Sequence, residues 1–152
     1  MIEDKLKTMG IELPAAPAPL ASYVPAVRAG ELVFTSGQLP LVNGQLAQKG
    51  KVGREVDPQT AYQAARQCAV NCLAVVQGLT GSLDRVAKIV KVTGYVASAP
   101  GFHEQPKVVN GASDLLVEIF GEAGRHARAA VGVSELPLDA PVEVEMVVQL
   151  AE

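Results

Sequence analysis

Tryptophan is absent from this chain of 152 residues, and phenylalanine and tyrosine occur only three times each. Valine, leucine, isoleucine and alanine must therefore form most of the core, which is typical of tightly packed layers of helix and sheet. A hydrophobic share of 49% beside 19% charged residues excludes a disordered chain. A single globular domain is expected, able to bury about 70% of the surface that its unfolded chain exposes.

Strong charge of either sign is also lacking. The net charge of -3 provides no general attraction to nucleic acid or to anionic membranes. Residues 1–7 carry mixed charges and no apolar run, which argues against a signal peptide or a transmembrane helix there. We therefore expect a cytoplasmic protein with no membrane partner, and nucleic acid is an unlikely partner because RNA binding would need a local basic patch.

Cysteine and histidine are scarce, with two of each. Cys68 and Cys72 lie four residues apart in an apolar helical pattern, which predicts buried small hydrophobic side chains; a metal or redox role is the alternative. His103 and His126 fall in different loops with no neighbouring cysteine, which argues against zinc. No phosphate-binding loop or dinucleotide fingerprint is present, so neither metal nor organic cofactor is expected.

Periodicity and turn residues divide the chain into a leader, residues 1–20, and one domain, residues 21–152. The leader combines a short amphipathic helix over 2–9 with a proline-rich spacer. The domain is predicted to contain, in order, strands over 23–28 and 31–38, an exposed loop over 41–56, a helix from Pro58 to Gly81, a strand over 86–97, a helix over 106–120, and two terminal strands. This β-β-α-β-α-β-β order predicts a mixed sheet with both helices on one face, an α+β fold.

The terminal segment, residues 124–150, has the pattern of an antiparallel hairpin. In that hairpin Arg128 would lie opposite Gln149, on the face turned away from the helices, together with Glu143. Arg128 and Glu143 would then be about 20 Å apart along the strands. One small ligand could not touch both in a single chain, so a site that uses both residues requires contact between subunits.

Several motifs extend over nearly all of the chain after the leader. They are Tyr23-Val24, the run from Leu32 to Pro40, Leu83-Asp84-Arg85-Val86, Val109-Asn110, Phe120-Gly121-Glu122, the run from Ala127 to Val133, Leu136-Pro137, and the run from Val142 to Glu145. Together they resemble the Rid (reactive intermediate deaminase, RidA/YjgF) family. The resemblance implies a chorismate-mutase-like fold assembled as a homotrimer, with clefts between subunits.

The resemblance also implies a reaction. Arg128 would grip the carboxylate of a small 2-imino or enamino acid, and Glu143 would orient or activate a water, giving a 2-oxo acid and ammonia without metal or cofactor. The positions implied to line the cleft are Tyr23, Ser36, Gly37, Asn110 and, through its backbone, Ala130. A trimer of the same fold that binds a small carboxylate, or regulates another protein, without turnover is the alternative. An endoribonuclease using Arg125, His126 and Arg128 is disfavoured, because no extended basic and aromatic track accompanies them.

Two departures qualify the resemblance. Ala130 stands where the best-known members have cysteine, and Ala21-Ser22 stand where they have Gly-Pro, so pocket size and substrate can differ. The ligand need not be an imino acid in such a divergent subgroup.

Each candidate also has a structural reading. Arg128 could form an ion pair with Glu143 or Glu145 across an interface, and Glu143 could belong to an exposed strand face. Of the lining residues, Tyr23 could be core, Asn110 a surface residue of a helix, and Ser36-Gly37 a simple bulge.

Overall fold

The computed structural model of the protein describes residues 1–15 and 22–152. The helices are α1 (Ile2–Thr8), α2 (Pro58–Thr80) and α3 (Gln105–Phe120), and the strands are β1 (Ala26–Ala29), β2 (Leu32–Thr35), β3 (Val86–Ala97), β4 (Ala127–Val133) and β5 (Val142–Leu150). Three short 3-10 turns occupy Leu83–Arg85, Gly121–Gly124 and Pro137–Asp139. No helix in these described ranges combines the length and hydropathy that a membrane span requires.

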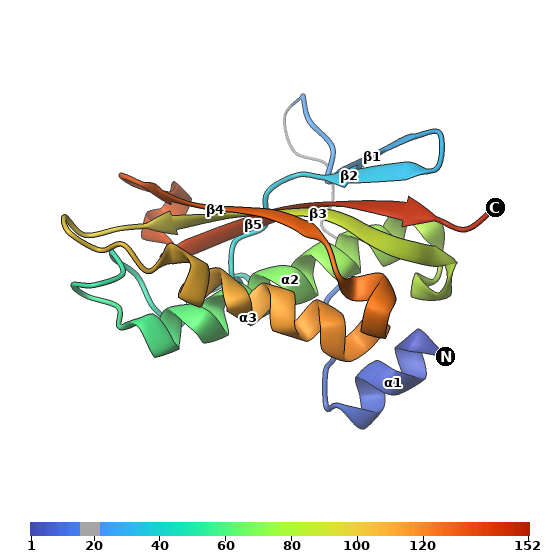
Figure 1. The fold of residues 1–152 in the computed structure, drawn as a ribbon, viewed down its shortest axis with the longest axis horizontal. Helices are drawn as coiled ribbons and strands as arrows, with labels where there is room; N and C mark the ends of the chain where they lie inside the picture. The colour runs from blue at the N-terminus through green and yellow to red at the C-terminus, as the bar shows by residue number, and fades with distance from the viewer. Residues whose placement is uncertain (16–21) are drawn as a thin grey trace.

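The five strands form one mixed sheet in the order β1-β2-β5-β3-β4. β3 and β4 run parallel, and the other neighbouring pairs are antiparallel. Both long helices, α2 and α3, cover the same face of this sheet (Figure 1). The predicted α+β fold, its element order and its single helical layer are confirmed.

The residues that begin and end the elements explain why local sequence predicted them well. The Asp57 side chain accepts a hydrogen bond from the Thr60 N–H, and Pro58 opens α2 where no backbone donor is needed. Gly81 closes this helix with φ at 88°, a left-handed conformation that glycine adopts without strain. β3 has the bounds that the sequence predicted, and α3 begins one residue earlier than expected.

The predicted terminal hairpin is wrong. β4 pairs in parallel with β3, while β5 lies between β2 and β3, so β4 and β5 are not neighbours. Arg128 is therefore the register partner of Val92 rather than of Gln149. The segment between β4 and β5 carries the chain across β3, and the small residues of β4 are left at the edge of the sheet. Alternation of side chains defines two faces but does not identify the neighbouring strand.

This topology also reverses the predicted faces of β4. Arg128, Ala130 and Gly132 align through β3 with Met146, Val144 and Val142, the buried residues of β5 that meet the helices. Val131 aligns with Glu143 through Tyr95 and lies on the open face, where it is 42% exposed. Val131 therefore does not share a face with Val144 and Met146, although the predicted hairpin required this.

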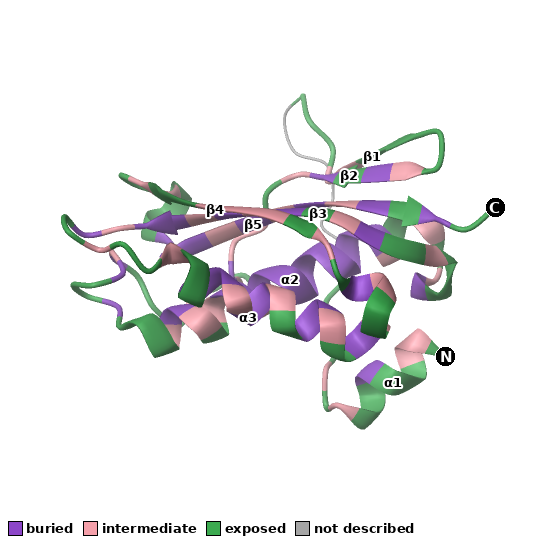
Figure 2. Cartoon of the chain, viewed as in Figure 1, coloured by how far each residue is buried: buried purple, intermediate pink, exposed green. Residues whose placement is uncertain are grey.

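The core fills the space between the sheet and the helix layer, as the buried positions facing each other in Figure 2 show. Cys68 and Cys72 lie fully buried within it with free thiols, which confirms their reading as small core residues. The loop over 41–56 is not simply exposed, because Val52 and Val56 are buried in the same core. Val52 is tied to the end of β3 by two backbone hydrogen bonds, to Ala97 and Ala99.

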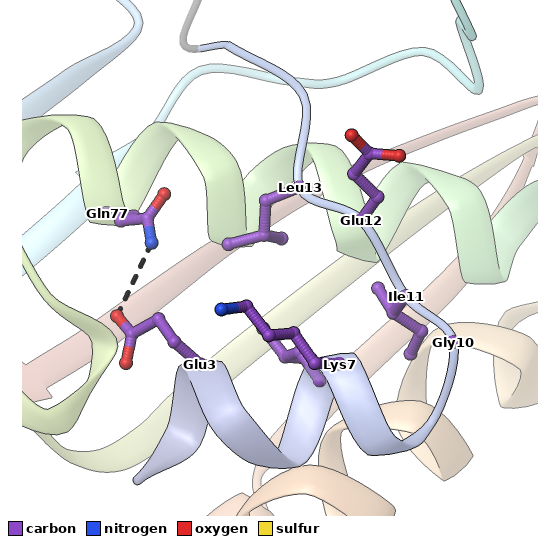
Figure 3. A pocket seen from close by; sticks show the side chains of 8 residues that line it. Glu3, Lys7, Gly10, Ile11, Glu12, Leu13 and Gln77 are labelled. Atoms are coloured by element: carbon purple, nitrogen blue, oxygen red, sulfur yellow. Dashed lines mark hydrogen bonds between the residues drawn. The ribbon is translucent and has the colours of Figure 1, made fainter.

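The leader helix packs on the body of the domain. Leu6 is 2% exposed and belongs to the main core cluster. The Glu3 carboxylate accepts hydrogen bonds from the Leu83 N–H at 2.7 Å, the Ser82 hydroxyl at 3.1 Å and the Gln77 amide at 3.4 Å. Figure 3 shows the Glu3–Gln77 bond at the rim of a hollow between α1 and α2. The proline-rich spacer falls in part on residues 16–21, which lie outside the described residues.

We expect Glu3→Gln to loosen α1 and lower the free energy of unfolding by about 1 kcal/mol, because charge-assisted hydrogen bonds become neutral ones. Burial opposes ionisation of Glu3, but the bonds from Leu83, Gln77 and Ser82 keep its pKa below the ordinary value of 4.5. The stabilisation of the fold by the Glu3 carboxylate is thus complete above the pKa that Glu3 has in the unfolded chain. It is lost as pH falls through the lower pKa that Glu3 has in the folded protein. Hydrogen exchange of the α1 amides and urea unfolding at pH 7 and pH 3.5 measure it. Equal differences between wild type and variant at both pH values would contradict this role of the Glu3 charge.

Candidate functional site

Arg128 lies on the edge strand β4 with its side chain turned toward the helices. Its Nη1 donates to Asn110 Oδ1 at 2.7 Å and to Ser113 Oγ at 3.2 Å. Both acceptors belong to α3, where a spacing of three residues puts them on the same side of the helix. The structure therefore brings together two residues that the sequence proposed, Arg128 and Asn110, and adds Ser113.

The two bonds use both hydrogens of Nη1 and leave the other edge of the guanidinium free. Within residues 1–15 and 22–152, no protein acceptor bonds to Nε or Nη2 of Arg128. An arginine carries five N–H donors in a planar fork that matches the two oxygens of a carboxylate. The Nε–Nη2 edge is therefore available for a bidentate carboxylate. An ion pair of Arg128 with Glu143 or Glu145 across an interface between subunits stays the alternative prediction.

Ala130 lies two residues further along β4 on the same face. It is partly buried against the main core cluster, and its register partner in β3 is Gly94. A Cβ at Gly94 would approach Val109 to 2.4 Å, so this part of the sheet lies close against α3. Ala130 thus forms a small apolar surface beside the Arg128–Asn110 pair.

A second group of predicted residues gathers around Glu143 on β5. A Cβ at Gly37 would lie 2.2 Å from Glu143 Oε1, so a larger residue at position 37 would force this carboxylate to move. The neighbouring Ser36 hydroxyl donates to the Val24 carbonyl at 2.7 Å and secures the entry to β1. Gly37 and Glu143 are therefore in contact, while Ser36 supports the backbone next to them.

Tyr23 lies just before Val24, with 58% of its surface exposed. It is not a core residue in this chain. The structure records no hydrogen bond between Tyr23 and a described residue of the second group, so its place in a cleft stays a prediction.

The electrostatics around Glu143 oppose ionisation of its carboxyl group. Partial burial, followed by the nearby charge of Glu145, raises the pKa of Glu143. Glu145 itself accepts a hydrogen bond from the Tyr95 hydroxyl, and this bond, with partial burial, raises the pKa of Tyr95 to about 12. A carboxyl group whose pKa is raised toward neutrality exchanges a proton more readily at neutral pH than an ordinary carboxyl group does.

The two groups lie on opposite faces of the sheet. Arg128 is level with Met146 on the helix side, whereas Glu143 lies three residues along β5 and points to the open side. The Cα atoms of Arg128 and Glu143 are about 14 Å apart, because the two residues lie two strands apart across the sheet and three residues apart along it. The predicted register and its distance of about 20 Å were wrong, but the predicted separation of Arg128 and Glu143 within one chain is correct.

Two contributors were missed from the sequence. A spacing of three residues on the predicted helix puts Ser113 on the same side as Asn110, so the sequence carried a signal for it. Tyr95 carried no local signal, because its contact with Glu145 depends on β3 and β5 being neighbours. In the described part of the chain, no group of three or more His, Cys, Asp or Glu side chains is arranged to hold a metal ion.

The sheet with its single helical layer, and the residues at its edge, define a chorismate-mutase-like α+β protein. Residues 3–150 match the family described as "YjgF/chorismate_mutase-like, putative endoribonuclease". The chain belongs to this family, to which the Rid and RutC proteins also belong.

Three relatives cover nearly the whole chain. Protein TCP17 of Trypanosoma cruzi is 45% identical over 95% of this chain and 91% of its own length. The crystal structure of Atu1372 from Agrobacterium tumefaciens is 48% identical with a TM-score of 0.92, and the match covers 99% of this chain and 92% of that one. The 2-iminobutanoate/2-iminopropanoate deaminase of Dermatophagoides farinae is 32% identical over 91% of this chain and 93% of its own.

Proposed function

We propose that the protein hydrolyses small 2-imino acids, or the enamines in equilibrium with them, to 2-oxo acids and ammonia. The observation that carries the proposal is the free Nε–Nη2 edge of Arg128, held in place by Asn110 and Ser113. The name of the Dermatophagoides farinae relative, a 2-iminobutanoate/2-iminopropanoate deaminase, supports the same reaction.

The chemistry asks little of the protein. In a 2-imino acid the carboxylate adjoins the C=N carbon, so a guanidinium that fixes the carboxylate also fixes the electrophile. Glu143 takes a proton from water as its oxygen bonds to that carbon. This proton passes to the nitrogen and gives a carbinolamine. The hydroxyl proton of the carbinolamine follows it to the nitrogen as the C=O bond forms and the C–N bond breaks, so that ammonia and the 2-oxo acid leave. The raised pKa of Glu143 suits a group that acts first as base and then as acid.

We propose further that the protein acts as a homotrimer with its sites between subunits. Arg128 and Glu143 lie on opposite faces of one sheet and cannot meet at one small substrate within a chain. The open face that carries Glu143 also exposes Val27, Phe34 and Val131 by 53, 43 and 42%. Large apolar side chains on a face without helices favour burial against another subunit.

RNA is a poorer fit than a small carboxylate. The chain has a net charge of -3, and Glu143 and Glu145 lie side by side on the open face. Arg125, next to the site, already pairs with Glu122 at 3.2 Å. A small anion bound by one arginine needs no extended positive surface, whereas single-stranded RNA does.

An amino-acid oxidase that generates 2-iminopropanoate or 2-iminobutanoate, with trapping of the imine by semicarbazide, tests the proposal. We expect the protein to accelerate loss of the imine and formation of the 2-oxo acid well above the rate in buffer. Arg125→Ala serves as the matched control, because it removes a nearby exposed arginine with its own partner and should retain the activity. If the imine is lost no faster with the protein than in buffer, the proposed hydrolysis is refuted and carboxylate binding without turnover is left as the alternative.

A further inference from the structure

A chain of hydrogen bonds runs from Arg128 back to the turn that precedes β4. Arg128 Nη1 lies 3.2 Å from Ser113 Oγ, Ser113 Oγ lies 2.8 Å from His126 Nε2, and His126 Nδ1 lies 2.6 Å from the Gly124 carbonyl oxygen. Ser113 belongs to α3, and His126 directly precedes β4. The three side chains thus link the helix, the turn and the edge strand around one guanidinium.

The atoms at the two ends determine the direction of this chain. The Gly124 carbonyl can only accept, so His126 Nδ1 carries a hydrogen and, in the neutral ring, Nε2 is an acceptor. Ser113 has one hydroxyl hydrogen, which it donates to Nε2. Its lone pairs then face Arg128 Nη1, which can only donate. Each of the hydrogens that link His126, Ser113 and Arg128 Nη1 then has one acceptor, and this assignment requires the neutral Nδ1–H tautomer of His126.

We propose that Ser113 and His126 are positioning residues that orient Arg128 for the substrate carboxylate, and that they do so only while His126 is neutral. This inference rests on the proposed function, because it assigns the Nε–Nη2 edge of Arg128 to a carboxylate. Asn110 and Ser113 hold the two hydrogens of Nη1 and thereby fix the plane of the fork. A bidentate contact needs the fork to be correct in rotation as well as in place.

Protonation of His126 would reverse the middle bond. Nε2–H and Nη1–H would then both point at Ser113 Oγ, and two cations would meet across one oxygen. Burial lowers the pKa of His126 from its ordinary 6.5, the bond to Gly124 opposes this, and the charge of Arg128 lowers it further. The chain of bonds is therefore intact at neutral pH and breaks as pH falls through the lowered pKa.

The other charged groups around His126 have partners or lie on other strands. Arg125 pairs with Glu122 in the preceding turn, and Asp114, next to Ser113 on α3, accepts the Tyr62 hydroxyl at 2.7 Å. Lys91 of β3 is the register partner of Ala127 and is exposed. Arg128 is thus the charge that acts most directly on His126.

Binding of pyruvate, the product of the simplest substrate, tests the inference without turnover. We expect Ser113→Ala to weaken pyruvate binding about tenfold at pH 8, as loss of one oriented contact would, and Ser113→Thr to retain it.

The histidine variant tests the pH dependence. In His126→Gln, the glutamine Oε1 can accept the hydrogen bond from the serine hydroxyl, so this variant should bind pyruvate like wild type at pH 8. In wild type the dissociation constant should rise below the pKa of His126, and in His126→Gln this rise should vanish. His103→Gln, which changes the other, exposed histidine, should keep the wild-type pH profile.

Unchanged pyruvate affinity in Ser113→Ala, or a pH profile that persists in His126→Gln, would overturn the inference. Nitrogen-15 spectra of the ligand-free protein give an independent result. They should show His126 as the Nδ1–H tautomer, and a protonated ring at pH 8 or the Nε2–H tautomer would also overturn it. A wild type that shows this tautomer but neither binds pyruvate nor hydrolyses imines would instead refute the proposed function.

Discussion

Arg128→Ala and Glu143→Gln should each lower kcat/KM for imine hydrolysis by about 100-fold, and co-expression of the two inactive chains should restore activity. In Arg128→Ala the carboxylate loses its bidentate anchor, and in Glu143→Gln the water loses its proton acceptor. If a site takes Arg128 from one subunit and Glu143 from its neighbour, random mixing leaves about a quarter of the sites with both native residues. The imine assay on purified mixed trimers measures this recovery.

The mixture distinguishes an intersubunit site from any site within one chain. A site built within one chain would remain inactive in every mixed oligomer, because each chain carries one of the two changes. Mixing Arg128→Ala chains with Arg125→Ala chains provides a control, in which about half of the sites should work. Activity below one-tenth of wild type in the Arg128/Glu143 mixture, with the control at half, would contradict the shared site.

The local elements could be predicted because their signals are local. The cap at Asp57, the left-handed Gly81 and the valine-rich run of β3 are each decided within a few residues. The order of the elements then limited the arrangement to helices on one face of a mixed sheet.

The neighbours of the last two strands could not be predicted in this way. An antiparallel pairing of β4 with β5 and a parallel pairing of β4 with β3 leave the same alternation in the sequence. Which pairing forms depends on where α3 returns the chain to the sheet. It also depends on which of the two strands, β4 or β5, has enough large apolar residues to lie between two other strands. β5 has them, with Val142, Val144, Met146, Val148 and Leu150 all buried. β4, with its alanines and glycine, remains at the edge.

The same limit applies to the candidate site. The motif around Arg128 indicated the arginine, and Asn110 followed from the resemblance to the Rid family. Their hydrogen bond, the contribution of Ser113 and the role of His126 depend on α3 lying against β4. Tertiary packing brings these side chains together, and their spacing in the sequence shows only part of it.

That packing depends on one close approach between the two long helices. A Cβ at Gly111 would lie 1.9 Å from the carbonyl oxygen of Tyr62 and 3.2 Å from the backbone nitrogen of Arg66. Gly111 follows Asn110 directly, so the residue that lets α2 and α3 touch is adjacent to the residue that holds Arg128. Any separation of the helices would therefore move Asn110 and Ser113 relative to β4.

Gly111→Ala should consequently lower both stability and binding. The added methyl meets backbone atoms, which cannot rotate away, so we expect a loss of about 3 kcal/mol in the free energy of unfolding and of about 10 °C in Tm. Pyruvate binding should weaken in whatever folded protein remains, because α3 shifts. Glu118→Ala is the matched control on the same helix, since it removes only the partly exposed Arg66–Glu118 pair at 3.5 Å and should change stability by less than about 0.5 kcal/mol. Thermal and urea unfolding at one protein concentration compare the two variants. Equal stability of the two variants would show that α2 and α3 tolerate a wider separation than the structure implies.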